Sequence, residues 1–277
     1  MERALRAGHP AEEMVDLDRY PIADLASGEG GAFAAKCRQQ YETTGLCMLN
    51  GFIRPEALAR LATEAEGLSD KAYFCKSTHN AYLTEEEGLE SGDVRARQEE
   101  TYVGSVAYDL IPEEASLRTL YNWDPLRDFI GAVLGKPKLH RFADIMGACS
   151  INVFKDGGEH GWHFDESEFT VTLMLQPPEK GGAFEYVPQI RGLTDEHERV
   201  GRILDGDRDG VVELPFTPGT LLIFGGNQTI HRVARVSGAT KRLVPVLCYA
   251  EKEGVTNSPE VRKLFWGRTG AEAGAPV

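Results

Sequence analysis

Eight short segments rich in β-branched and aromatic residues follow one another between residues 139 and 250, and they constrain the fold more than any other feature. Turn residues separate them, and one helical insert over 195–206 interrupts them. Many short strands at such spacing are typical of a sandwich or barrel, and eight strands in two sheets form a jelly roll. The segments are LHRFAD, CSINVF, FTVTLMLQ, AFEYVP, VVELPF, TLLIFG, IHRVARV and RLVPVLCYA.

The first half of the chain has helical character instead. Apolar residues recur at helical spacing over 31–44, and Pro55 opens a second helix that runs to about residue 69. Two shorter helices are expected over 114–122 and 125–134, the second ended by a glycine. Residues 46–53 predict a short strand, and residues 70–110 an irregular, charged segment.

These elements predict a single domain over residues 1–277, mainly β with α, in which N-terminal helices buttress a jelly-roll, cupin-like core. No free linker divides the chain. The expected parts are a lead-in over 1–30, helical support and a lid over 31–138, the β-sandwich core over 139–250, and a C-terminal helix and tail over 251–277.

Composition excludes several classes of partner. The chain carries 30 basic and 43 acidic residues, a net charge of −13, which disfavours nucleic acid and anionic membranes as partners. No stretch has the length of a membrane helix or the apolar core of a secretory signal. Five scattered cysteines without a CxxC pair indicate reduced thiols, so we expect a cytoplasmic protein.

A possible metal site appears in the run GGEHGWHFDESEF. His163 and Asp165 are two residues apart, so on an extended segment their side chains point to the same face. His231 follows the strand-like run TLLIFG and is the candidate third ligand. Two histidines and one carboxylate on one face form the facial triad of non-haem Fe(II) oxygenases, which leaves open positions on the metal. The same donors would also suit a zinc hydrolase.

Arg242 distinguishes these two interpretations. It lies on the next expected strand after His231, where a guanidinium would grip a carboxylate through two hydrogen bonds. Iron in such a triad commonly works with 2-oxoglutarate and O2, and the distal carboxylate of 2-oxoglutarate needs such a partner. A zinc hydrolase gives Arg242 no role. The neighbouring Lys241 has the opposite strand parity and is expected to face away.

The order HxD…H…R resembles that of Fe(II)/2-oxoglutarate-dependent oxygenases with a double-stranded β-helix fold. Over residues 73–267 the chain further resembles the free-amino-acid radical halogenases, such as lysine halogenases, and their hydroxylase relatives; HGWHFD, GGAFEYVP and HRV with Arg242 carry this likeness. Those halogenases have Gly or Ala at the carboxylate position, which opens a chloride site on iron. Asp165 stands there in this chain, so the resemblance implies a hydroxylase.

The resemblance also implies roles for residues around the metal. Asn152 is expected to face the pocket and Thr172 to bond 2-oxoglutarate. His160 and a closing Trp266 are expected to contact the substrate, whose carboxylate would bind Arg97 or Arg95. For its amine, Glu166 is the first candidate and Asp144 the second. The segment STHNAYL resembles a motif of this group, so His79, Asn80 and Tyr82 are expected over the site.

The expected substrate is a small molecule, a free amino acid or a related amine-bearing metabolite. Val246 and Cys248 stand where lysine halogenases offer polar side chains, which leaves amino acids other than lysine open. Hydroxylation of a protein-bound or carrier-tethered residue is one alternative, and a non-catalytic cupin-like binding module is another. The assembly state stays open between a monomer and a homodimer.

Overall fold

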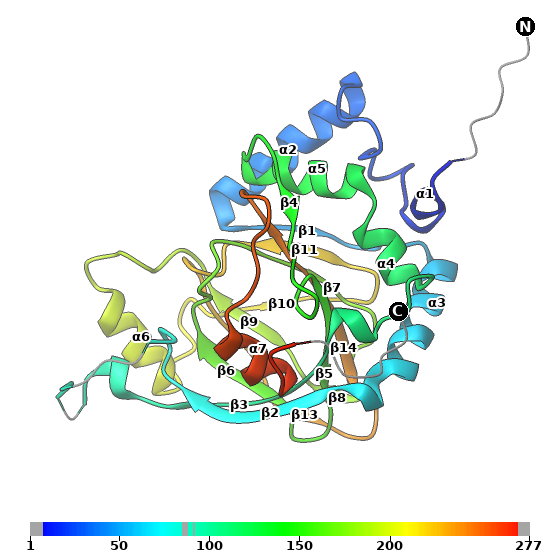
Figure 1. Cartoon of the computed structure of the whole chain (residues 1–277). Coiled ribbons are helices and arrows are strands. Elements are labelled where there is room, and N and C mark those ends of the chain that lie inside the picture. The colour runs from blue at the N-terminus through cyan, green and yellow to red at the C-terminus, as the bar shows by residue number, and fades with distance from the viewer. Residues whose placement is uncertain (1–7, 85–87, 91, 271–277) are drawn as a thin grey trace, which may run out of the picture.

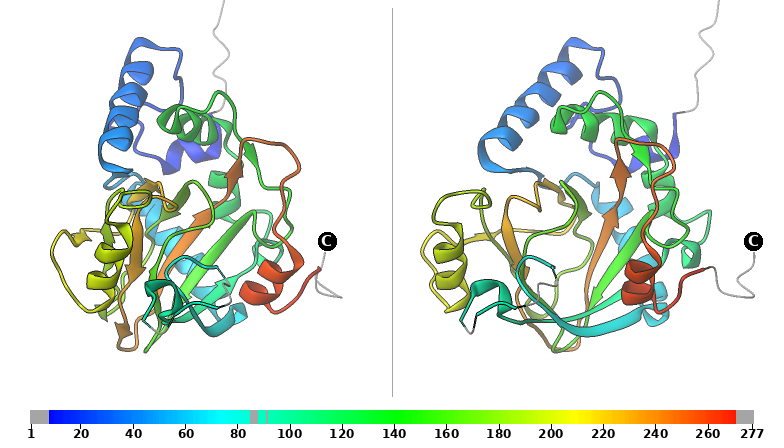
Figure 2. Two further views of the ribbon diagram at one scale, coloured as in Figure 1. Left: turned by 90° about the vertical axis from the view of Figure 1, so that its left-hand side faces the viewer. Right: turned by 60° about the vertical axis from the view of Figure 1, so that its left-hand side comes forward.

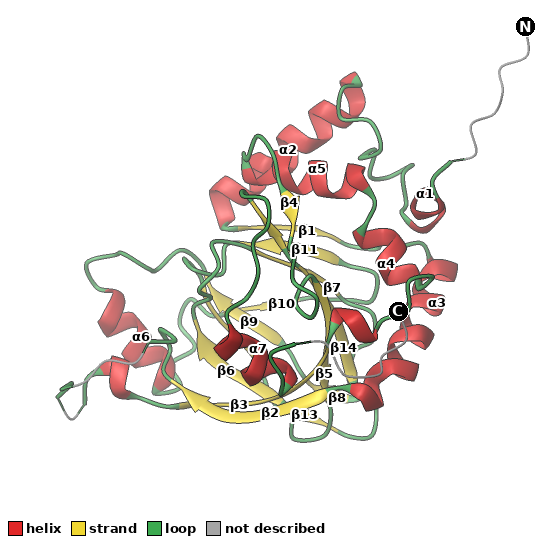
Figure 3. Ribbon diagram, in the orientation of Figure 1, coloured by secondary structure: helices red, strands yellow, loops and turns green. Residues whose placement is uncertain are grey.

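A computed structural model describes residues 8–84, 88–90 and 92–270, and its centre is a curled antiparallel sheet (Figures 1 and 3). Neighbouring strands follow the order β1-β11-β7-β14-β5-β3-β6-β12-β9-β10, and β2 pairs with β3. The strands of this sheet are β1 (Leu46–Leu49), β2 (Tyr73–His79), β3 (Glu99–Val106), β5 (Cys149–Phe154), β6 (Glu159–His163), β7 (Thr170–Leu173), β9 (Phe184–Val187), β10 (Val212–Leu214), β11 (Leu221–Phe224), β12 (Ile230–Val233) and β14 (Arg242–Leu247).

Two small two-stranded sheets and a set of helices complete the described fold. The small sheets pair β4 (His140–Arg141) with β15 (Tyr249–Ala250), and β8 (Lys180–Gly181) with β13 (Val236–Ser237). The helices are α1 (Pro10–Met14), α2 (Gly28–Thr44), α3 (Pro55–Leu68), α4 (Ser116–Tyr121), α5 (Asp124–Leu134), α6 (Glu196–Leu204) and α7 (Pro259–Trp266), with 3-10 turns η1 (Ser69–Lys71), η2 (Val94–Ala96) and η3 (Tyr108–Leu110). None of the described helices could span a bilayer.

The helices lie on the outside of the curl. Figure 2 shows the sheet wrapped around an interior, with α2 and α5 at one end of it. In Figure 1, α3 lies along one side of the sheet and α6 along the opposite side. Side chains of β14 alternate between the outside and the inside of the curl. Leu243 and Leu247 point outward and join the apolar core shared with the helices. Arg242 points inward and lies beside Phe154. The largest apolar core therefore lies outside the curl, and the interior is left for other side chains.

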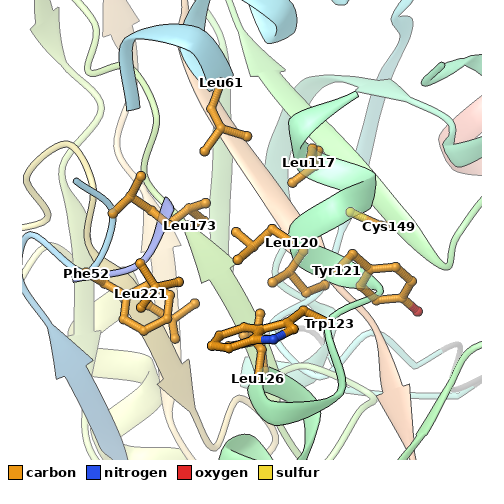
Figure 4. Packing of buried hydrophobic residues seen from close by; sticks show 14 of the residues in the cluster. Phe52, Leu61, Leu117, Leu120, Tyr121, Trp123, Leu126, Cys149, Leu173 and Leu221 are labelled. Atoms are coloured by element: carbon orange, nitrogen blue, oxygen red, sulfur yellow. The ribbon is translucent and has the colours of Figure 1, made fainter. Parts of the chain in front are cut away.

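That outer core joins the helical half of the chain to the sheet. Figure 4 shows side chains of α4 and α5 directed toward the sheet residues Leu173 and Leu221. Leu120 and Leu126 are fully buried there, and Trp123 is 2 % exposed. A smaller apolar cluster, which includes Trp162 and Ile203, lies between α6 and the outer face of β6, β9 and β12. The sheet is thus supported from both sides by helices.

The jelly-roll prediction is confirmed, and the eight β-rich segments all contain strands of the structure. The helical insert is α6, and the helices expected near residues 55, 114 and 125 are α3, α4 and α5. Residues 70–110 differ from the prediction, because they hold β2 and β3, which pair with each other and attach to β5 and β6. Charged residues on the exposed face, such as Lys76 and Glu100, hid the strand pattern of this hairpin.

Replacement of Leu120 by Ala tests this description of the outer core. The change leaves a cavity between α4 and the sheet, so we expect the free energy of unfolding to fall by about 2–5 kcal/mol in denaturant titrations. Leu264→Ala on α7 is the matched control, because that side chain is 45 % exposed, and it should change stability by less than about 0.5 kcal/mol. Equal effects of the two substitutions would contradict the assignment.

Candidate metal centre

Two neighbouring strands bring the candidate ligands together. His163 is the last residue of β6, and it lies directly opposite His231 of β12 in the antiparallel register. Asp165 follows β6, and its Oδ1 lies 3.4 Å from His163 Nε2 and 3.5 Å from His231 Nε2. The three donor atoms lie within 4.8 Å of one another, as atoms that share one metal ion do. The two histidines are buried, at 3 % and 4 % exposure.

Backbone carbonyls fix the tautomer of both histidines. His163 Nδ1 lies 2.8 Å from the carbonyl oxygen of Gly161, and His231 Nδ1 lies 2.9 Å from that of Thr229. A carbonyl oxygen only accepts, so each Nδ1 must carry the hydrogen. Each Nε2 then keeps its lone pair and points it toward Asp165. Hydrogen bonds of this kind orient metal-ligating histidines in proteins generally.

The second oxygen of Asp165 is held by residues that the sequence did not single out. Thr170 Oγ1 donates to Asp165 Oδ2 at 2.6 Å, and the Asp165 amide donates to the carbonyl oxygen of Gly226 at 3.0 Å. A Cβ atom at position 226 would collide with the Asp165 carboxylate, so only glycine fits there. The glycine pair after TLLIF was the available sequence signal for this close approach.

The electrostatics of the centre favour the metal-binding protonation states. Burial raises the pKa of Asp165, but the imidazoles of His231 and His163 outweigh it and hold that pKa well below its usual range. Burial lowers the pKa of His163, and His231 lowers it further. Asp165 is therefore ionised while His163 is neutral. Two histidines and one carboxylate suit ferrous iron with open coordination positions.

Arg242 is a buried cation without a counter-ion among the described residues. It is 2 % exposed, and its Nε has no hydrogen-bond partner. Its guanidinium lies 5.2 Å from the ring centre of Phe154 and 5.8 Å from that of Phe216, and desolvation lowers its pKa to about 9. An unpaired buried charge costs several kcal/mol, so this site suits a ligand carboxylate. Lys241 faces outward, as expected, and bonds Glu66 Oε1 at 2.9 Å.

Thr172 and Asn152 lie on strands next to Arg242. Thr172 is opposite Val246 of β14, and Asn152 is opposite Val244 of the same strand. The hydroxyl of Thr172 is buried and has no hydrogen-bond partner in the described structure. Strand parity places both residues on the interior face that Arg242 shares. The unsatisfied Arg242 and Thr172 thus fit a small polar acid bound between these strands and the metal ligands.

A β-bulge brings His160 to the same side as His163. Between their paired positions, β6 advances from His160 to His163 while β12 advances only from Val233 to His231, so β6 contains one extra residue. The two rings stack, with centroids 3.9 Å apart and an interplanar angle of 20°. Simple alternation would have put these residues, three apart, on opposite faces.

His79 stands at the edge of this stacked pair. Its ring centre lies 5.4 Å from that of His160 and 5.6 Å from that of His163, and the nitrogens of the three rings form a second group within 4.8 Å. An imidazole lone pair lies in the ring plane, and a metal in the plane of His163 would lie off the plane of the stacked His160. His160 therefore flanks the candidate metal position, and the facial triad remains the better donor set.

Several residues expected near the substrate are engaged elsewhere. Asn80 uses its side-chain oxygen to accept from the amides of Tyr82 and Thr84 in its own turn. Arg97 donates to Asp205 Oδ1 at 2.8 Å and to the carbonyl oxygen of Gly201 in α6. The side chains of Asn80 and Arg97 thus already have protein partners. Asn80 closes its own turn, and Arg97 ties the segment before β3 to α6.

Of the other residues expected to contact the substrate, one is exposed to solvent and two are buried. Glu166 is exposed immediately after Asp165. Asp144 is buried and anchors the C-terminal segment, since its Oδ2 accepts from the Asn257 amide at 2.7 Å and from Arg262 Nε at 2.9 Å. Trp266 of α7 is 8 % exposed and belongs to a small apolar cluster with Ala107 and Met146. Asp144 is therefore an anchor for α7.

Solved structures with similar folds support the architecture. An oxidoreductase of the 2OG-Fe(II) oxygenase family from Burkholderia pseudomallei is 19 % identical over 80 % of this chain and 92 % of its own, with a TM-score of 0.51. AviO1 from Streptomyces viridochromogenes is 18 % identical over 80 % of this chain and 96 % of its own (TM-score 0.54). The non-heme alpha ketoglutarate dependent epimerase SnoN from nogalamycin biosynthesis is 16 % identical over 79 % and 83 % (TM-score 0.55).

Sequence comparison identifies the family. No curated protein matches the chain. The family model described as HalD, halogenase D, matches residues 31–264, a span that includes the three candidate ligands and Arg242. Because this match covers most of the sequence, the chain belongs to the halogenase D family.

Proposed function

We propose that this protein is an Fe(II)/2-oxoglutarate-dependent hydroxylase of a small amino-acid-type metabolite. The observation that carries the proposal is the position of Asp165, whose Oδ1 faces both histidine Nε2 atoms while Thr170 holds its Oδ2. This geometry supplies three ligands on one side of a metal. The family's name points to halogenation, and this carboxylate is the reason to propose hydroxylation instead.

In this proposal the interior polar residues bind 2-oxoglutarate. The guanidinium of Arg242 binds the distal carboxylate, and Thr172 and Asn152 contribute polar groups beside it. When bound, iron and 2-oxoglutarate use O2 to oxidise a substrate C–H bond to C–OH and release succinate and carbon dioxide. The apolar surroundings of Arg242, with Phe154 and Phe216, keep water from competing for its charge.

Asp165 decides between oxygen and halogen transfer. Its carboxylate fills the position that stays open in the resembling halogenases, and its negative charge repels a halide. Thr170 donates to the carboxylate and the main chain at Gly226 packs closely against it, so it cannot swing away to admit an anion without losing the bond from Thr170. Substitution of chloride for Asp165 is therefore disfavoured both sterically and electrostatically.

The substrate part of the proposal comes from the resemblance and from the arrangement around His160. That residue flanks the metal position, and Glu166 and Trp266 lie on segments that border the site in the resembling group. SnoN is an epimerase from nogalamycin biosynthesis, which fits a small-molecule substrate for this fold. We include a free amino acid or an amine-bearing relative in the proposal for these reasons.

Anaerobic addition of Fe(II) and 2-oxoglutarate tests the proposed cofactors. We expect the weak visible charge-transfer band that a chelated 2-oxo acid gives on Fe(II). Arg242→Leu removes the buried partner of the distal carboxylate, so the Kd for 2-oxoglutarate should rise by about 30-fold or more. Lys241→Ala on the outer face should leave this Kd within about twofold. The absence of any band from the wild-type protein would refute the proposal.

A second prediction concerns Thr170. Its hydroxyl fixes the Asp165 carboxylate, so Thr170→Val should weaken Fe(II) binding by about 10–100-fold, measured by competition with a chelating dye. Thr170→Ser keeps the hydroxyl and should recover most of the affinity. Thr43→Val, on the exposed surface of α2, is the control. Unchanged affinity in Thr170→Val would show that Asp165 is not held through this bond.

Substrate identity is accessible through succinate release. The holoenzyme in air should form succinate rapidly only in the presence of its substrate, because substrate triggers oxygen use in this class of enzyme. We expect a hit among free amino acids and related amines. Succinate formation that responds only to a peptide or a carrier-linked amino acid would contradict the small-molecule part of the proposal.

A further inference from the structure

Buried polar atoms without partners occur in two pairs, one on β7 and β14 and the other on β2 and β3. The first pair is Arg242 and Thr172, already assigned to 2-oxoglutarate. The second pair is His79 Nε2 and Thr101 Oγ1, both buried and without a hydrogen-bond partner in the described structure. Such atoms are uncommon in a folded interior, where nearly all polar groups are satisfied. The second pair therefore indicates a polar ligand other than 2-oxoglutarate.

The register of β2, β3 and β6 brings a third group to this place. His79 lies directly opposite Glu99, and Thr101 lies directly opposite His160. Val103 packs with Phe154 in an apolar cluster inside the curl. Glu99 and Thr101 have the same strand parity as Val103, so their side chains also face the interior. His79, Glu99 and Thr101 thus form one group, which we call the hairpin subsite, beside the stacked histidines.

The hairpin subsite offers mainly hydrogen-bond acceptors. His79 Nδ1 lies 3.0 Å from the carbonyl oxygen of Asn80 and must donate to it, which leaves a lone pair on Nε2. Glu99 Oε2 accepts from the Trp162 amide at 3.2 Å, and no basic side chain in the described ranges pairs with the Glu99 carboxylate. Thr101 adds a hydroxyl that can accept or donate.

A primary ammonium group satisfies all three residues at once. It carries three donors and no acceptor, and its positive charge complements Glu99. A neutral hydroxyl group would satisfy Nε2 of His79 but would leave the charge of Glu99 without a partner. A carboxylate would be repelled. Glu166 is exposed, so water competes with it for a cation more strongly than at the half-buried Glu99.

We propose that His79, Glu99 and Thr101 bind a primary ammonium group of the substrate. This inference rests on the proposed function, because the subsite matters only if a substrate binds beside the metal. It moves the recognition of the amine from the loop after Asp165 to the β2–β3 hairpin. The hairpin then orients the substrate against His160, which lies beside His79 and opposite Thr101.

The test uses the holoenzyme with Fe(II) and 2-oxoglutarate without oxygen. Probes are the proteinogenic amino acids and linear α,ω-diamines, and binding is followed as a change in the charge-transfer band. We expect at least one of these amines to bind. Glu99→Gln keeps the acceptor for the Trp162 amide and removes the charge, so it should weaken that binding about tenfold or more. Thr101→Val should weaken it less, in the same direction.

Two controls separate the outcomes. Glu100→Gln changes the next residue, whose side chain is 67 % exposed near Arg235, and should leave the Kd within about twofold. The des-amino analogue of the bound probe should no longer distinguish Glu99→Gln from wild type. An intact band with no response to any amine, or equal Kd values in Glu99→Gln and Glu100→Gln, would overturn this inference alone. A missing band in wild type would instead be a failure of the proposed function.

Discussion

The pairing of β6 with β12 is the constraint on which the site depends. It places His163 opposite His231 across one antiparallel ladder, and the chain that leaves β6 then returns Asp165 to the same two imidazoles. Backbone carbonyls at Gly161 and Thr229 orient the rings, so much of the ligand geometry is set by main-chain structure. Such a centre is rigid because moving one ligand would break strand pairing.

The two faces of the sheet have different roles: the outer face stabilises the fold, and the inner face carries the polar groups of the candidate site. Apolar side chains on the outer face join the helices in the main core, and their burial supplies most of the hydrophobic stabilisation. The inner face then holds groups that are costly to bury, above all Arg242, Thr172 and His79. These groups lower stability when unpaired and favour ligands that pair with them. Burial of apolar side chains in the outer core offsets that loss of stability.

Local patterns in the sequence predicted the strands of the second half and the candidate ligands. His163, Asp165 and Arg242 could be selected because strand parity and side-chain chemistry are both readable from neighbouring residues. The strands β2 and β3 could not be predicted in this way, because their exposed faces are charged. Their stability comes from pairing with each other and, for β3, with strands farther along the chain. The bulge that turns His160 inward also depends on the register between two distant segments, β6 and β12. The contact of Thr170 with Asp165 joins residues only five apart, but it depends on how the loop between them folds back.

The central claim is that Asp165 makes this member of the halogenase D family transfer oxygen. The most direct measurement is the mass of the product formed from the true substrate in buffer saturated with chloride, with the reaction repeated under labelled oxygen gas. We expect a gain of one oxygen atom that carries the label, and no chlorine isotope pattern. A product in which chlorine replaces hydrogen would contradict the account, because chloride would then have reached a position that the Asp165 carboxylate is held to occupy.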